Sequence, residues 1–292
     1  MSALLDIRDL HLTIGGTPVL RGVSLRVGAG RIVGLVGESG AGKSMVGRVI
    51  LGLEPDGARV TGGRVAFADR DLVALPDRER HALLGRDIAL VPQHPMTALN
   101  PVARIEPQIT DVLREHLALE RGAARIRALD LLDSVHIREP ARVLRQFPHQ
   151  LSGGMRQRIL IAIAFACRPR LVIADEPTTA LDVTVQRQIL RLLAELQAAH
   201  GTAVLFITHD LGVVAKICDE VAVMHGGRIL ETGTTADLFR DPAHAYTRAL
   251  FAATPRHDRP NDVPAPIPEA LSQRLVAEER ALDAQRVMNH GH

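Results

Sequence analysis

Residues 37–44 read Gly-Glu-Ser-Gly-Ala-Gly-Lys-Ser, a G-x-x-x-x-G-K-S spacing whose residue types suit the binding of a polyphosphate. Glycines let successive backbone N–H groups point into one concavity, and the N-terminus of a following helix adds partial positive charge. Lys43 would reach the β- and γ-phosphates of a nucleotide, and the Ser44 hydroxyl would bind Mg²⁺. The alternative interpretation is a tight strand-to-helix turn with an incidental lysine. The residues expected to contact the nucleotide are Gly37, Glu38, Ser39, Gly40, Ala41, Gly42, Lys43 and Ser44.

The segments on either side of this loop are those that the motif requires. Residues 31–36 form an apolar run rich in β-branched side chains, which is typical of a buried strand. Residues 45–51 contain no proline and predict a helix. Strand, glycine loop and helix follow one another as in a phosphate-binding loop.

Other apolar runs also end in polar side chains. Strands that alternate with helices predict a mostly parallel sheet, in which ligands bind at the carboxyl ends of the strands. The runs are residues 88–93, which end at Gln93; residues 170–176, which end at Asp175 and Glu176; and residues 203–209, which end at His209.

These strand-end side chains can take different roles in phosphoryl transfer to water. Asp175 would hold Mg²⁺ through water, and Glu176 would polarise the attacking water. His209 would hydrogen-bond the γ-phosphate, and Gln93 would bridge Mg²⁺ and the water. The structural alternatives are a helix cap for the two carboxylates and an ordinary core histidine for His209.

Composition limits the class of protein. The chain has 292 residues, of which 46% are hydrophobic, 23% charged and only 2% aromatic, so we expect a soluble protein with an aliphatic core. The net charge of +2 gives no general argument for nucleic acid, and we expect none as a partner. The longest apolar run, residues 159–167, is far shorter than the ~20 residues of a membrane span, and acidic residues interrupt the N-terminus where a signal peptide would be apolar. We therefore expect a cytosolic chain with two buried thiols, Cys167 and Cys218.

The chain also shows how it is organised. Residues 4–14 and 19–27 predict two strands joined by a turn, and residues 61–63 predict a turn that leads into a strand at 64–68. Few strand-like runs occur from 94 to 169, which indicates a helical subdomain inserted into the α/β core. We expect one domain over residues 1–254 and a proline-rich linker and tail over residues 255–292. Residues 270–288 predict a short helix, either docked as an arm or frayed.

A second motif identifies a family. Residues 151–157, Leu-Ser-Gly-Gly-Met-Arg-Gln, resemble the signature motif of ATP-binding cassette (ABC) ATPases, and they lie between the phosphate loop and the Asp-Glu strand as in that family. Residues 180–182, Ala-Leu-Asp, resemble its D-loop, with Asp182 as the acidic residue. The resemblance covers residues 4 to about 235. It implies a P-loop NTPase of ABC type, with a mixed sheet, N-terminal antiparallel strands and the inserted helical subdomain.

The resemblance also implies how two such domains work together. They would pack head to tail, so that each ATP is held by the phosphate loop of one domain and the signature motif of the other. The start of a helix at Ser152 fits this role, because its N–H groups and dipole favour the γ-phosphate. The residues expected to contact ATP from the partner are Ser152, Gly153, Gly154 and Gln157.

A narrower resemblance concerns transport. Residues 93–101 and 244–250 are similar to segments of dipeptide, oligopeptide and nickel importer ATPases. This implies an ATPase at the cytoplasmic face of the cell membrane, with a second ATPase, two membrane-spanning permease subunits and a solute-binding protein. A coupling helix from the permease would contact the helical subdomain. Di- or oligopeptides are the favoured solute, with nickel or another small solute such as glutathione as the alternative.

Two other interpretations remain open at this point. One is a soluble ABC-type ATPase that acts on ribosomes, DNA or cofactor assembly, and the other is an exporter subunit. The single phosphate loop and single signature motif favour transport over the first, and residues 93–101 favour import over the second.

The chain departs from the family pattern at several positions. Ile14 lies where members place an aromatic residue against adenine, so we expect an apolar contact there. His94 replaces the usual Asp, and Ala41 and Ala98 replace Ser. No cysteine follows Cys218, so we expect no iron–sulfur cluster.

Overall fold

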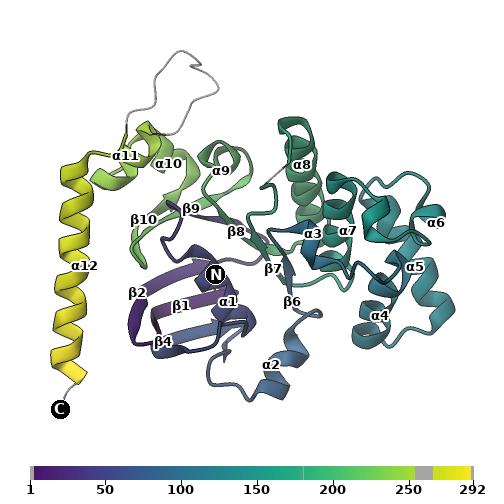
Figure 1. The fold of residues 1–292 in the computed structure, drawn as a ribbon, viewed down its shortest axis with the longest axis horizontal. Coiled ribbons are helices and arrows are strands. Elements are labelled where there is room, and N and C mark those ends of the chain that lie inside the picture. Colours follow the sequence, from purple (N-terminus) through teal and green to yellow (C-terminus); the bar gives the residue numbers. More distant parts are fainter. Residues whose placement is uncertain (1–2, 180, 254–265, 291–292) are drawn as a thin grey trace. The chain divides into compact units, whose positions relative to one another are not determined.

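The computed structural model describes residues 3–179, 181–253 and 266–290, with side chains up to residue 284 in the last segment. The chain divides into two compact units. One comprises residues 1–28, 32–75 and 207–292, and the other residues 29–31 and 76–206. We call the first the loop unit, because it contains residues 37–44, and the second the signature unit, because it contains residues 151–157. Figure 1 labels most of their elements, which are numbered in chain order.

The loop unit contains an antiparallel sheet in the order β2-β1-β4-β5, which confirms the expected N-terminal antiparallel strands. Its other strands form a mixed arrangement, since β9 pairs antiparallel with β10 and parallel with β3. The strands are β1 (Leu5–Ile14), β2 (Thr17–Val27), β3 (Ile32–Val36), β4 (Ala58–Phe67), β5 (Arg70–Asp71), β9 (Glu220–His225) and β10 (Arg228–Thr234). The helices are α1 (Lys43–Leu51), α9 (Leu211–Ile217), α10 (Thr235–Arg240), α11 (Ala245–Ala252) and α12 (Glu269–His290).

The turn predicted at residues 61–63 is wrong, because these residues lie inside β4. The register of β1 shifts between Ile7 and Leu10 against β2 and between Arg8 and His11 against β4. Asp9 lies within both intervals and has a positive φ of 48°. A Cβ at Gly63 would overlap the carbonyl oxygen of Asp9. The glycine therefore accommodates a bulge in the neighbouring strand rather than a turn.

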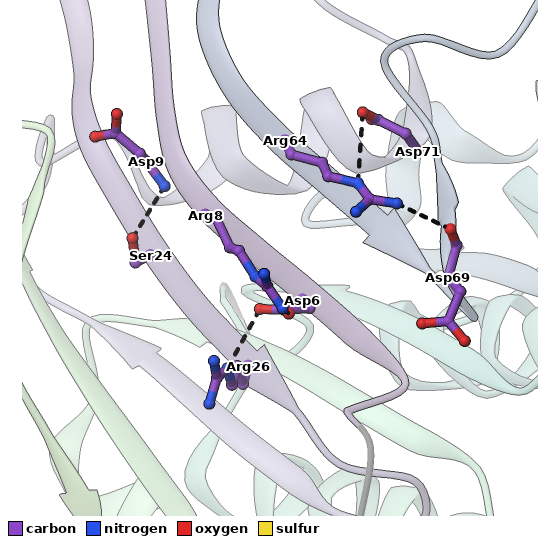
Figure 2. Close-up of polar contacts among 8 residues, drawn as sticks. All are labelled: Asp6, Arg8, Asp9, Ser24, Arg26, Arg64, Asp69 and Asp71. Carbon is purple, nitrogen blue, oxygen red and sulfur yellow. Dashed lines mark hydrogen bonds and ion pairs between the residues drawn. The ribbon is translucent and has the colours of Figure 1, made fainter.

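Charged side chains lie along this antiparallel sheet (Figure 2). Arg8 donates to Asp6 within β1, and Arg26 reaches the same carboxylate from β2. The hydrogen bond from Arg8 is the main cause of the lowered pKa of Asp6. Arg64 on β4 pairs with Asp71 on β5 at 3.7 Å. These pairs cover the strands with charge while the alternate residues of β1 are buried, which is the pattern of a sheet with one solvated face.

In the signature unit β7 lies between β6 and β8, and it pairs in parallel with β6. From 94 to 169 every regular element is a helix, as the sequence predicts. The strands are β6 (Ile88–Val91), β7 (Leu171–Asp175) and β8 (Ala203–Thr208), whose last two residues belong to the loop unit. The helices are α2 (Asp77–Leu83), α3 (Pro95–Ala98), α4 (Ile105–Leu117), α5 (Arg121–Ser134), α6 (Pro140–Val143), the 3₁₀ helix η1 (Pro148–Gln150), α7 (Gly153–Phe165) and α8 (Val183–His200).

Most buried side chains are aliphatic, in agreement with the composition, although Phe67, Phe165 and Phe206 are also buried. Every residue of β3 and of β8 is buried. The expectation of two buried thiols holds for Cys218, where burial raises the pKa to about 12. It is wrong for Cys167, which is only half-buried.

The predicted tail helix packs against other elements of the loop unit. Arg21 on β2 pairs with Asp283 of α12, and Leu275 of α12 is only 3% exposed. The helix therefore forms a docked arm. Most of the proline-rich linker predicted from residue 255 lies outside the described residues.

Candidate functional site

Close packing explains two of the glycines in the phosphate loop, Gly37 and Gly42. The loop follows β3, and α1 begins directly after Gly42, whose φ is 98°. A Cβ at Gly37 would overlap the carbonyl oxygen of Met224 on β9. A Cβ at Gly42 would lie 3.0 Å from Met224 Cε and 3.1 Å from Leu20 Cδ2. Only glycine fits these two positions without a shift of the surrounding chain.

Lys43, the first residue of α1, contacts this loop. Its side chain is buried, and its Nζ donates to the carbonyl oxygens of Gly37 and Glu38, each at 2.8 Å. A buried ammonium group is costly unless it has acceptors or an anion beside it. Ser44 follows in the first turn of α1, where N–H groups and the helix dipole favour anions. The glycine-lined loop, the ammonium group of Lys43 and the N-terminus of α1 together suit the phosphates of a nucleotide.

Two further candidates also belong to the loop unit. Ile14 ends β1 and is half-buried, so its aliphatic side chain is partly available for an apolar contact. His209 directly follows β8 and is exposed. The next residue, Asp210, caps α9 by accepting from the amide of Val213.

In the signature unit the structure brings Gln93 and Glu176 together. They follow the neighbouring parallel strands β6 and β7, and Nε2 of Gln93 donates to Oε2 of Glu176 at 2.8 Å. Asp175 is the last residue of β7 and is half-buried. The pairing of the two strand ends explains why side chains 83 residues apart in sequence meet. Because Nε2 of Gln93 is used by Glu176, Oε1 is the amide atom that can approach a cation.

The sequence analysis missed Thr179. Its hydroxyl donates to the same Oε2 of Glu176 at 2.9 Å, and its amide donates to the Glu176 carbonyl at 3.1 Å. Glu176 has a positive φ of 45°, a conformation that costs a non-glycine residue of order 1–3 kcal/mol. The pair of threonines directly after Pro177 was the available signal, because threonine hydroxyls often close such turns.

The signature motif begins α7, as predicted. Ser152 is the N-cap, and its hydroxyl accepts from the amide of Met155 at 3.3 Å. Gly153 and Gly154 form the first turn. A Cβ at Gly154 would lie 2.9 Å from Val185 of α8, so this glycine lets the two helices approach closely. The exposed Ser152 and the half-buried glycines leave the start of α7 accessible.

Two other predicted residues of this unit are Gln157 and Asp182. Gln157 is fully buried, and neither of its amide atoms has a hydrogen-bond partner among the residues that the structure describes. Direct contact of Gln157 with a nucleotide would therefore require a rearrangement of α7. Asp182 caps α8 by accepting from the amides of Thr184 and Val185 at 3.0 and 2.9 Å. Ala180 of the D-loop segment lies outside the described residues.

The donors proposed for Mg²⁺ are chemically suitable. Ser44, Gln93 and Asp175 supply a hydroxyl, an amide oxygen and a carboxylate, the oxygen ligands that this ion prefers alongside water and phosphate. Within the described part of the chain, no three His, Cys, Asp or Glu side chains gather into a metal site.

Comparison with known proteins decides the family. Residues 20–179, more than half of the chain, match the family model described as ABC transporter. The chain belongs to the ABC transporter family. Residues 230–276 of this ABC ATPase also match a model described as the C-terminal region of oligopeptide/dipeptide transporters.

Curated relatives resemble the ABC ATPase over most of its length. It is 46% identical to the probable D,D-dipeptide transport ATP-binding protein DdpD of Escherichia coli (strain K12), over 91% of this chain and 82% of that protein. It is 42% identical to the dipeptide transport ATP-binding protein DppD of Bacillus subtilis (strain 168), over 100% of this chain and 93% of that protein. The peptidoglycan transport ATP-binding protein YejF of Agrobacterium fabrum is 47% identical over 96% of this chain, which spans only 55% of that longer protein.

Solved structures confirm the fold class. A dimeric ATP-binding cassette in a post-hydrolysis state, bound to ADP and phosphate, is 27% identical and covers 79% of this chain and 98% of its own, with a TM-score of 0.70. The ATP-binding subunit of another ABC transporter, 29% identical, covers 81% of this chain and 92% of its own, with a TM-score of 0.66. Within the described residues of the present ABC ATPase, no helix is both long and apolar enough to cross a membrane.

Proposed function

We propose that this ABC ATPase powers the import of di- or oligopeptides through an ABC transporter. The match of residues 230–276 to the C-terminal region of oligopeptide/dipeptide transporters carries the proposal. The similarity of the chain to the two dipeptide transport ATP-binding proteins supports it. Nickel or another small solute such as glutathione remains the alternative solute.

The phosphate loop is the proposed site for the ATP phosphates. Lys43 and the loop amides would neutralise charge on the transferred phosphoryl group, and Ile14 would contact adenine. Ser44, Asp175 and Gln93 would hold Mg²⁺, which when bound adds further charge neutralisation. The buried ammonium of Lys43 and the close-packed glycines support this assignment.

Glu176 is the proposed general base, and its contact with Gln93 is the observation that carries this role. Gln93 and Thr179 both donate to one carboxylate oxygen, so they hold the carboxylate in one orientation. A base must be oriented toward the water that it polarises. Gln93 would orient Glu176 and would also bridge Mg²⁺ and the attacking water. His209 would hydrogen-bond the γ-phosphate.

The proposed assembly contains a second ABC ATPase, packed head to tail, with two permease subunits and a solute-binding protein. Ser152, Gly153 and Gly154 would then bind the ATP of the partner through the start of α7. The accessible N-terminus of α7 and the dimeric state of a solved relative support this arrangement. The chain would lie at the cytoplasmic face of the membrane, bound to the permease.

The decisive experiment is affinity purification of the full chain from native membranes in mild detergent, with the partners identified by mass spectrometry. We expect two polytopic membrane subunits, a second ATPase and a solute-binding protein. Peptides should then stimulate ATP hydrolysis by the reconstituted complex, and Ni²⁺ should not. Recovery of ribosomes or of soluble proteins alone would contradict the transport role. Stimulation of ATP hydrolysis by Ni²⁺ and not by peptides would show that the transported solute is nickel.

A further inference from the structure

A buried tyrosine from the C-terminal part of the chain contacts the phosphate loop. The hydroxyl of Tyr246, at the start of α11, donates to Oε2 of Glu38 at 3.1 Å. Tyr246 is 0% exposed. Burial and the neighbouring charge of Glu38 raise the pKa of Tyr246, so the phenol stays protonated and serves as a donor.

Glu38 is thereby held at two points. Lys43 binds its backbone carbonyl oxygen at 2.8 Å, and Tyr246 binds its carboxylate. A carboxylate on a loop that receives polyphosphate repels the ligand unless it is held away from it. The hydrogen bond from Tyr246 fixes the direction in which this carboxylate points.

The helix that carries Tyr246 is anchored by a second carboxylate. Glu231 of β10 accepts from the amides of Ala243 and His244 at 2.7 and 3.0 Å. The ring of His244 caps α11 by accepting from the amide of Tyr246 at 3.1 Å. The position of the phenol is therefore set by β10 as well as by packing.

The C-terminal helix α12 reaches the same tyrosine through His225. The rings of His225 and Tyr246 meet edge to face, with centroids 4.6 Å apart. On its other side, Nδ1 of His225 lies at an ion-pair distance of 3.0 Å from Oε1 of Glu279 in α12, without the geometry of a hydrogen bond. Both His225 and Glu279 are largely shielded, with side chains 16% and 18% exposed.

A bidentate ion pair holds α12 in this place. Arg21 donates from Nε and Nη2 to the two carboxylate oxygens of Asp283 at 2.8 and 3.0 Å. Its remaining nitrogen donates to the carbonyl oxygen of Gly226 at 2.9 Å. Gly226 leaves the space that Glu279 fills, because a Cβ there would overlap that carboxylate.

From these contacts we propose that Tyr246 is a positioning residue of the phosphate loop, and that docking of α12 strengthens nucleotide binding through Glu279, His225 and Tyr246. The proposal rests on the nucleotide site assigned above to Lys43. By linkage, nucleotide binding must in turn stabilise the docked α12.

The first test is Tyr246→Phe, which removes only the hydroxyl and keeps the ring that packs against His225. In the full chain, the Kd for a fluorescent ATP analogue should rise about three- to tenfold. This is less than the full value of a charge-assisted hydrogen bond, because the bond from Tyr246 is also present in the protein without nucleotide. In the reconstituted transporter KM for ATP should rise while kcat changes less than about twofold. In a Glu38→Ala background the same substitution should have no further effect. An unchanged Kd, or an equal loss in both backgrounds, would overturn the role of Tyr246.

The second test concerns α12. Arg21→Asp and Asp283→Arg should each weaken binding of the analogue by about two- to fivefold, and the double exchange should restore it. Glu279→Gln should also weaken binding. Glu269→Gln is the matched control, because Glu269 is an exposed residue of α12 that accepts a hydrogen bond from Gln273 of the same helix, and the substitution should leave the Kd unchanged. Wild-type affinity in the Arg21, Asp283 and Glu279 variants would overturn the coupling to α12.

Lys43→Ala separates this inference from the site on which it rests. If Lys43→Ala abolishes binding and Tyr246→Phe does not alter it, only the positioning role fails. If Lys43→Ala itself binds ATP normally, the proposed nucleotide site fails first. Hydrogen exchange adds the reciprocal measurement, since ATP should slow exchange of the α12 amides in the wild type and not in Tyr246→Phe.

Discussion

The phosphate loop and the turn at Glu176 both follow a buried strand, yet they obtain their shape in different ways. The loop relies on glycines, which allow its backbone to lie against Met224 and Leu20. The Glu176 turn places a non-glycine residue at a φ of 45° and holds it with hydrogen bonds from Gln93 and Thr179. One shape is set by the absence of side chains and the other by their presence.

This difference predicts unequal effects for two glycines of the loop. Gly37→Ala should have the largest effect of all, because its Cβ would overlap a backbone oxygen that cannot rotate away. We expect loss of ATP binding and a fall in the free energy of unfolding of about 1–3 kcal/mol or more, as in overpacked cores. Thermal unfolding and binding of a fluorescent ATP analogue measure both.

Gly40→Ala is the matched control. Gly40 has a φ of 83°, and among the described residues no atom lies within 4 Å of an added Cβ, so only backbone strain of about 1–2 kcal/mol applies. Equal damage by both substitutions would show that conformation, and not close packing, requires glycine in this loop.

The same difference explains what could be predicted from sequence. The loop, the signature helix and the strand ends are set by short-range patterns, so G-x-x-x-x-G-K-S and the cap at Ser152 were visible directly. The parallel-sheet rule predicted that Gln93 and Glu176 lie at strand ends facing the same side, whereas the pairing of β6 with β7 that joins them came from the structure. Tyr246 lies 208 residues from Glu38, and no local pattern indicates that contact. The bulge at Asp9 was equally invisible, and Gly63 was therefore assigned to a turn.

At the Glu176 turn the carboxylate itself should matter most. Glu176→Gln keeps an oxygen that accepts from Gln93 and Thr179 but cannot take up a proton. We expect ATP affinity near that of the wild type and turnover lower by roughly 10² or more, the scale of a lost general base. Steady-state hydrolysis by the reconstituted complex and equilibrium binding test the two halves of this prediction. Turnover within a factor of a few of the wild type would assign the base to another residue.

Thr179→Val tests whether the hydrogen bond from Thr179 to Glu176 contributes to activity and stability. Valine keeps the volume and removes the hydroxyl that reaches Glu176. We expect turnover to fall by about tenfold and the free energy of unfolding by about 1 kcal/mol, the value of one hydrogen bond. Thr179→Ser is the control, because it keeps the hydroxyl and should retain most of the activity. If serine and valine behave alike, the contact with Glu176 does not orient the base.

The smallest predicted effect tests whether the conformation of the phosphate loop depends on the distant carboxylate of Glu231. Burial opposes ionisation of Glu231, but hydrogen bonds that include the amides of Ala243 and His244 outweigh it and lower the pKa of this carboxyl. A lowered folded-state pKa stabilises the fold above the unfolded-state pKa, near 4.3, and the contribution is lost as pH falls through the folded-state pKa. Glu231→Gln should therefore be less stable than the wild type at pH 7, with the difference vanishing in acid.

We expect this difference to be below about 1 kcal/mol, because solvent screens a partly exposed carboxylate. Chemical denaturation at pH 7 and near pH 3 measures it. Since Glu231 anchors the helix of Tyr246, the same substitution should also weaken ATP binding at pH 7 by a factor of about two, a smaller effect than that of Tyr246→Phe. Lost stability with unchanged ATP affinity would mean that α11 holds its tyrosine without this carboxylate, and that the glycine loop needs less support from the C-terminal part of the chain than its contacts suggest.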